Sequence, residues 1–204
     1  MESHTHADLA QTPSKTGRTG VSLAIWHQPA NRGLELANVE ATPDGWHVCG
    51  AVSLIHNDRP TLLRYSVVCD QAWRTLRACV EGMVNEAIVR HKMERRDTGR
   101  WLFDGREAPD LDGCIDIDLN FSPITNMLPI RRLSLALGES AVVNAAWLRF
   151  PSFSLERLDQ MYRRTGANAY HYESAGGSFH ADLTVDEFGL VLDYPPFWIR
   201  APAG

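Results

Sequence analysis

Alternation of apolar and polar residues with a period of two constrains the fold of this chain more than any other feature. The run from Cys114 to Phe121 alternates strictly, and the run from Leu62 to Cys69 places Leu63, Tyr65 and Val67 on one face. An amphipathic helix would need an apolar stripe with a period of about 3.6 residues, and no long segment shows one. The chain is therefore predicted to be mainly β, with at most two short helices.

Further strands are expected at residues 44–52, 75–81, 133–137 and 141–150, followed by a meander over 170–194. Residues 71–90 could also form a helix. The turn sequence Asp97-Thr98-Gly99 instead favours a hairpin of residues 86–93 with 100–104, because short turn sequences that contain glycine join antiparallel strands.

The two halves of the chain resemble each other. Residues 44–49 parallel 112–117, residues 72–77 parallel 154–159, and residues 101–104 parallel 190–193, in the same order. We expect an internal duplication of about 21–108 and 109–200 within a single domain over 21–204, arranged as one twisted antiparallel sheet or half-open barrel. Residues 1–20 are polar and are expected to form a disordered arm.

Composition excludes several classes of protein. The formal charge of −5 and the pI near 5.9 argue against nucleic-acid binding, which needs a clustered basic excess. No apolar run is long enough for a transmembrane helix, and no secretory signal precedes residue 21. The four cysteines form no CxxC pair. We expect reduced thiols and a cytoplasmic protein.

Asp116-x-Asp118-x-Asn120 matches the start of a calcium loop, but Phe121 stands where glycine is needed and Met127 where glutamate is needed. A metal role is therefore not expected, either there or for the His4-x-His6 pair. The two aspartates would lie about 7 Å apart on one strand face, a spacing suited to acid–base chemistry but shared by any two residues at i and i+2.

The chain has no nucleophile elbow, no cysteine in a catalytic context and no nucleotide motif, so neither catalysis nor a cofactor is expected.

The segment from Ser122 to Leu133 holds two prolines and is predicted to be a rigid loop that leads into a strand. Arg131 and Arg132 would then point to opposite faces, and the inward one would need a carboxylate or an anionic ligand. Two interpretations stay open: a buried pair with Asp116 or Asp118 that braces the loop, or a clamp for an anionic head group. Large aromatic residues also recur at strand positions that could share one face, as amphipathic pockets require: Trp46, Tyr65, Trp101, Trp147, Tyr162, Tyr170, Tyr172 and Trp198.

These motifs resemble the putative glycolipid-binding family of bacterial proteins. The resemblance rests on Leu111-Asp112-Gly113-Cys114-Ile115-Asp116-Ile117-Asp118-Leu119, on Ser122-Pro123 and on residues 125–133; it extends to Gly99-Arg100-Trp101, Ala145-Ala146-Trp147, Tyr162-Arg163-Arg164 and residues 189–198. Met127 and Arg163 depart from the pattern. The resemblance implies a spiral β-roll of two similar halves whose concave surface holds a lipid, and it supplies no catalytic residues.

We therefore expect a binder of a glycolipid or another amphipathic small molecule. One alternative is an enzyme of unassigned class that uses Asp116 or Asp118 as a base and Arg131 or Arg132 as an anion clamp. Another is an interaction module that pairs as a homodimer. The candidate ligand-binding residues are Arg64, Tyr65, Asp116, Asp118, Arg132, Trp147, Tyr162, Arg164, Tyr170 and Tyr172.

Overall fold

A computed structural model describes residues 21–202, so the expected arm at 1–20 and the pair His4 and His6 lie outside the described residues. The chain begins with six long strands: β1 (Val21–Gln28), β2 (Gly33–Thr42), β3 (Gly45–His56), β4 (Arg59–Asp70), β5 (Thr75–Val84) and β6 (Ala87–Arg95). Short elements follow: β7 (Trp101–Phe103), β8 (Arg106–Glu107), the 3₁₀ turn η1 (Pro109–Leu111), β9 (Asp116–Leu119), the 3₁₀ turn η2 (Ile124–Asn126) and helix α1 (Met127–Leu133). The chain ends with β10 (Ser140–Leu148), β11 (Leu155–Gly166), β12 (Ala169–Ser174), the 3₁₀ turn η3 (Ala175–Gly177), β13 (Phe179–Val185), β14 (Val191–Tyr194) and β15 (Trp198–Arg200).

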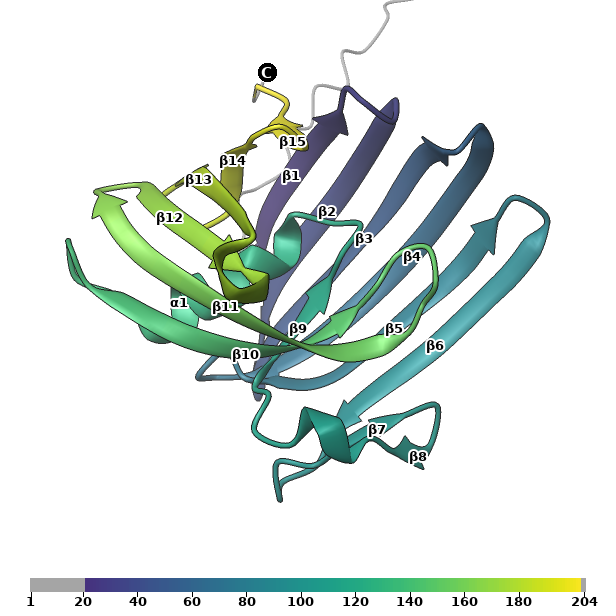
Figure 1. Ribbon diagram of the computed structural model, residues 1–204, viewed down its shortest axis with the longest axis horizontal. Helices are drawn as coiled ribbons and strands as arrows, with labels where there is room; N and C mark the ends of the chain where they lie inside the picture. Colours follow the sequence, from purple (N-terminus) through teal and green to yellow (C-terminus); the bar gives the residue numbers. More distant parts are fainter. Residues whose placement is uncertain (1–20, 203–204) are drawn as a thin grey trace, which may run out of the picture.

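All described strands belong to one sheet, ordered β8-β7-β6-β5-β4-β3-β2-β1-β15-β14-β13-β12-β11-β10-β9. Neighbours are antiparallel except β9 and β10, which are parallel. The chain thus moves outward from β1, crosses over to the other edge at β9, and returns until β15 pairs with β1. The sheet stays open but curls on itself, so that β9–β11 cross over the concave side of the first strands (Figure 1). This is the mainly β spiral roll that was expected, and the internal duplication stays a prediction.

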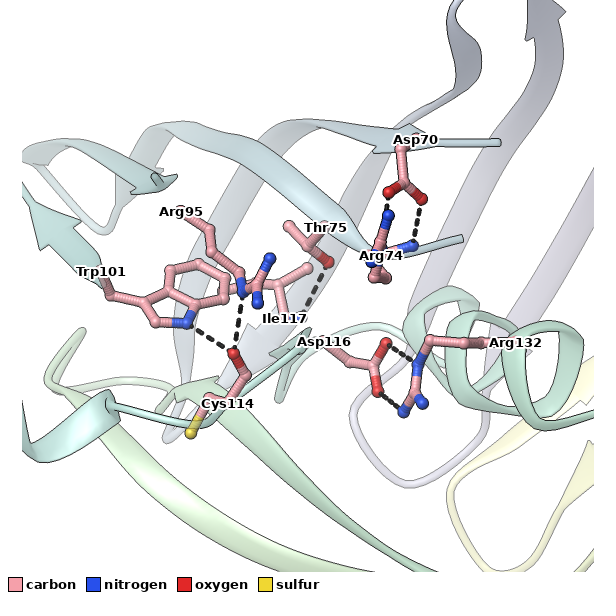
Figure 2. Close-up of polar contacts among 9 residues, drawn as sticks. All are labelled: Asp70, Arg74, Thr75, Arg95, Trp101, Cys114, Asp116, Ile117 and Arg132. Carbon is pink, nitrogen blue, oxygen red and sulfur yellow. Dashed lines mark hydrogen bonds and ion pairs between the residues drawn. The ribbon is translucent and has the colours of Figure 1, made fainter. Parts of the chain in front are cut away.

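Hydrogen bonds pin the curled edge to the first half of the sheet. The backbone N–H of Thr75 donates to the carbonyl of Ile115 at 3.3 Å, and the Thr75 hydroxyl accepts from the N–H of Ile117 at 3.0 Å. Trp101 Nε1 and Arg95 Nε both donate to the Cys114 carbonyl, at 3.0 and 3.1 Å (Figure 2). An edge strand would otherwise leave such groups unpaired, so these contacts hold β9 where its side chains face the interior.

Most of the expected strands are present. The hairpin of residues 86–93 with 100–104 is confirmed, since Met93 of β6 pairs with Phe103 of β7. The helix alternative for residues 71–90 is wrong, because residues 75–84 form β5. The expected alternation in β4 is also confirmed: Leu63, Tyr65 and Val67 are buried.

The segment from Ser122 to Leu137 differs from the prediction. Its first part forms η2 and α1 instead of a loop, and residues 134–137 form no strand. Ile124, Met127, Leu128 and Ile130 are buried, and so are Thr125, Asn126 and Pro129 between them, so the fold encloses this short helical segment on all sides up to Ile130. Pro129 is tolerated because it lies in the first turn, where its missing N–H would have no helical partner. The helix ends at Ser134, which has a left-handed backbone conformation.

Helix α1 lies inside the roll and joins its two apolar clusters. Met127 and Leu128 pack in the larger cluster, with Trp26, Leu63 and most of the buried side chains of β3–β5. Ile130 packs in the smaller cluster on β10–β14. The expected aromatic row is therefore divided: Trp46, Tyr65, Trp101 and Trp198 pack in or against the larger cluster, Tyr162, Tyr170 and Tyr172 belong to the smaller one, and Trp147 is half-buried. No helix within residues 21–202 has the length and apolarity needed to cross a bilayer.

Candidate functional site

A cavity of about 430 Å³ lies inside the roll between the two halves of the sheet. Its apolar wall comprises Leu54, Leu119, Phe121, Trp147, Phe150, Leu158, Ala175, Phe179, Phe197 and Trp198. Its polar groups are Gln28, Asn31, His56, Asp118, Asn120, Ser122, Asn126, Tyr172, Ser174 and Tyr194. A lining that combines apolar surface with placed polar groups is the usual character of a small-molecule site.

Asp118 is the carboxylate of this cavity. It projects from β9, and Gln160 Nε2 of β11 donates to its Oδ2 at 2.5 Å. Burial disfavours the charged form and raises the pKa of Asp118 to about 6, against the opposing effect of the Gln160 hydrogen bond. Among the described residues, only Gln160 donates a hydrogen bond to the Asp118 carboxylate, so Asp118 Oδ1 remains free to accept one.

Asp116 lies two residues earlier on the same side of β9 and is already paired with an arginine. Arg132 of α1 donates from Nε to Oδ1 at 3.1 Å and from Nη2 to Oδ2 at 2.6 Å (Figure 2). Burial raises the pKa of Asp116 and the Arg132 contact opposes this rise. The side chain of Asp116 is 2% exposed and that of Arg132 is 16% exposed. The pair therefore braces α1 against β9. This agrees with the first of the two interpretations left open by the sequence, a buried bracing pair, and not with an anionic head-group clamp.

Arg131 does not start a strand and does not lie opposite Arg132 on a sheet, so that expectation is wrong. Its guanidinium lies over the rings of Trp73 and Phe188, with centroids 5.4 and 5.0 Å away. It lines a separate cavity of about 230 Å³ that also includes Arg164, Asp186 and Glu187. Carboxylates and guanidinium groups are mixed in its wall, which gives this smaller cavity no single charge preference.

Three of the predicted residues, Asp118, Trp147 and Tyr172, meet in the main cavity. The guanidinium of Arg164 instead binds the backbone: it donates hydrogen bonds to the carbonyls of Leu135, Gly166 and Ala167 at 2.9, 3.2 and 2.6 Å.

Three further predicted residues lie outside the main cavity. Tyr162 donates its hydroxyl to Asn126 Oδ1 at 2.9 Å and is buried. Tyr170 lines the smaller cavity. Arg64 is exposed on the opposite face of β4 from Tyr65, so its assignment to the concave surface is wrong.

Glu35 is the residue that sequence reasoning missed. It is 0% exposed, and its Oε1 accepts from the Tyr65 hydroxyl at 2.5 Å and from the Ser122 hydroxyl at 2.6 Å. Burial raises the pKa of Glu35 to about 8, while both hydrogen bonds lower it. Its Oε2 is buried without a partner among the described residues. Ser122 links this group to the wall of the main cavity.

The interior position of Glu35 follows from the strand register of β2. Leu34 and Leu36 are 55% and 49% exposed, whereas Ala37 and Val39 are buried with Glu35. A one-residue change of register would exchange these two sets. The period-two spacing of Glu35 with Ala37 and Val39 was the available signal, and the two leucines obscured it. Glycine at position 50 makes room for the cluster, because a Cβ there would lie 2.4 Å from the Tyr65 hydroxyl oxygen.

The four cysteines are free thiols, and burial raises the pKa of Cys69 to about 12 and that of Cys114 to about 11. Within residues 21–202, no three or more His, Cys, Asp or Glu side chains are grouped as a metal site would require.

Comparison with known proteins agrees with this architecture. The sequence model of a family described as "putative glycolipid-binding" matches residues 23–200. The crystal structure of a DUF1089 family protein from Pseudomonas aeruginosa superposes with a TM-score of 0.73 and 29% sequence identity, covering 98% of this chain and 100% of that chain. No curated protein matches the sequence. Since the match spans nearly all of the roll, the chain belongs to the putative glycolipid-binding family.

Proposed function

We propose that this protein binds a glycolipid or another amphipathic small molecule in the main cavity. The observation that carries the proposal is a chamber of about 430 Å³ inside the roll, with a large aromatic and aliphatic wall and the desolvated carboxylate of Asp118. Ligand sites usually enclose roughly 300–1,000 Å³ and combine an apolar lining with a few placed polar groups. The four free thiols fit a cytoplasmic location for this binder.

Helix α1 and the Asp116–Arg132 pair support the proposal by their position. They fill and brace one part of the interior without occupying the main cavity. The apolar wall would take the hydrocarbon part of an amphiphile, since each buried CH₂ contributes about 0.8 kcal/mol.

Native mass spectrometry combined with lipid extraction tests this function. Wild-type protein is expected to carry or take up an amphiphile, and Leu158→Trp is expected to lose it because the larger ring would occupy the chamber that Leu158 lines. Leu137→Trp is the matched control, since Leu137 is 70% exposed and outside the cavity wall. Equal ligand content in wild type and Leu158→Trp would contradict the proposal.

A second candidate function is acid–base catalysis by Asp118. The observation in its favour is a carboxyl group facing a cavity with a pKa of about 6, close to the pH at which a general base works. Asp116 and Arg132 would act only as bracing, because they are paired with each other. Hydrolysis of a panel of nitrophenyl glycosides and esters would be compared between wild type and Asp118→Asn. A turnover that the variant loses supports catalysis, and equal background rates reject it.

A further inference from the structure

The fixed charge in the wall of the main cavity is negative. Among the described residues, its wall contains no lysine or arginine, while Asp118 contributes a carboxylate; its one imidazole, His56, has its Nε2 3.3 Å from the amide nitrogen Nδ2 of Asn57. The nearby guanidinium groups are engaged elsewhere: Arg132 with Asp116, and Arg164 with three backbone carbonyls. Arg149 lies over the ring of Trp147, with its centroid 5.0 Å away, and pairs with Glu156 on the exposed surface.

Several polar groups in the wall are already engaged within the protein. Asn120 Oδ1 accepts from the Phe150 N–H at 3.1 Å, Asn126 Oδ1 accepts from Tyr162, and the Ser122 hydroxyl donates to Glu35.

Two oxygen acceptors of the wall have no hydrogen-bond donor aimed at them from the described residues. Asp118 Oδ1 is free, and Gln28 Oε1 is buried without a partner among the described residues. A ligand that pairs with these two oxygens must donate hydrogen bonds to them.

A cluster of aromatic rings lies in the same wall. Tyr172 contacts Phe179 and Tyr194, and Phe197 contacts Phe179 and Tyr194, with ring centroids 5.6–6.2 Å apart. The negative charge of Asp118 acts on both tyrosines, and it contributes to their raised pKa values behind the larger effect of burial. Ring faces carry partial negative charge. Carboxylate and rings together make this part of the cavity attractive to positive or hydroxyl-bearing groups and repulsive to anions.

Building on the proposed function, we infer that the cavity selects amphiphiles whose polar end donates hydrogen bonds and carries no negative charge, with Asp118 as the selecting group. Sugar hydroxyls and an ammonium group share this chemistry. A phosphate, sulfate or carboxylate head would bring a second negative charge against Asp118 without a cation to offset it, and such repulsion is a common source of specificity.

Isothermal titration calorimetry at neutral pH tests the inference with three octyl amphiphiles below their micelle concentrations: octyl glucoside, octylammonium and octyl phosphate. We expect the glucoside or the ammonium to bind wild type at least about tenfold more tightly than the phosphate, a ratio equivalent to about 1.4 kcal/mol. In Asp118→Asn the ratio should fall to within about threefold by the same scale. A glucoside-type ligand should lose a few-fold in affinity in this variant, whereas an ammonium ligand should lose more.

Asp110→Asn is the matched control, because Asp110 is an exposed carboxylate outside the cavity wall. The control should keep the wild-type ratio. If octyl phosphate binds wild type as tightly as the other two, or if a folded Asp118→Asn variant keeps the wild-type ratio, the head-group inference is overturned while the binding function stands. If none of the three amphiphiles binds wild type, both are overturned. The wild-type ranking decides the question even if the variant fails to fold.

Discussion

Replacing Glu35 by glutamine should remove most of the loss of stability that this protein suffers as the pH rises. Glu35 is fully buried, and its carboxyl group accepts hydrogen bonds from Tyr65 and Ser122 on one oxygen while the other has no partner in the described part of the chain. Glutamine has nearly the shape of a protonated glutamate and can keep both accepted hydrogen bonds. The substitution therefore removes the titration with little change in packing.

The magnitude follows from the two pKa values of Glu35. The value rises from 4.5 for the free side chain to about 8 in the fold, and at about 1.36 kcal/mol per pKa unit this corresponds to about 5 kcal/mol. Between the two values the folded protein keeps a proton that the unfolded chain has released, so the stability falls as the pH rises. About 4 kcal/mol of this loss is expected between pH 5 and pH 9.

Urea unfolding followed by tryptophan fluorescence at pH 5, 7 and 9 measures the effect. Asp116 and Asp118 also have raised pKa values, so the informative quantity is the free energy of unfolding of Glu35→Gln minus that of wild type. This difference should increase by about 4 kcal/mol from pH 5 to pH 9. Glu40→Gln, an exposed position on the same strand, should follow wild type. Parallel curves for wild type and Glu35→Gln would refute the reasoning.

Three further changes test the interior. Arg132→Met should cost about 3–5 kcal/mol because it leaves Asp116 buried without its cation, and the double variant with Asp116→Leu should recover much of this loss in urea unfolding. Tyr162→Phe should cost about 1 kcal/mol through its lost hydrogen bond, and an unchanged unfolding midpoint would contradict that. At pH 8 an aromatic disulfide reagent should titrate at most two thiols in the native protein, because burial raises the pKa of Cys69 and Cys114, and all four in urea.

The strands were predictable because their signal is local. In β4 and β5 the apolar side chains recur every second residue, and one face of each strand is buried. The bracing role of Asp116 was also accessible, since a buried guanidinium near a strand rich in aspartate has few other partners. The family assignment rests on the same central segment and is confirmed by the match over residues 23–200.

The parts that could not be predicted depend on long-range packing. Helix α1 has seven residues, too few to show a full apolar stripe, and it is stabilised by both apolar clusters of the roll. The interior position of Glu35 depends on the pairing of β2 with its neighbours, in which Glu35 lies opposite Trp26. Arg64 looked suitable for a head group by type alone, and the strand alternation places it on the outer face.

The electrostatic character of the cavity depends on a difference between two aspartates, although their positions on the strand are equivalent. Asp116 and Asp118 share one side of β9, yet one meets the guanidinium of Arg132 and the other the neutral amide of Gln160. The helix causes this difference, because α1 brings its arginine to Asp116 and leaves Asp118 without a cation. A strand in place of α1 would have spaced Arg131 and Arg132 on opposite faces. The same segment that fills part of the roll thus leaves the remaining chamber with an uncompensated carboxylate, and this charge is what a ligand entering it would meet.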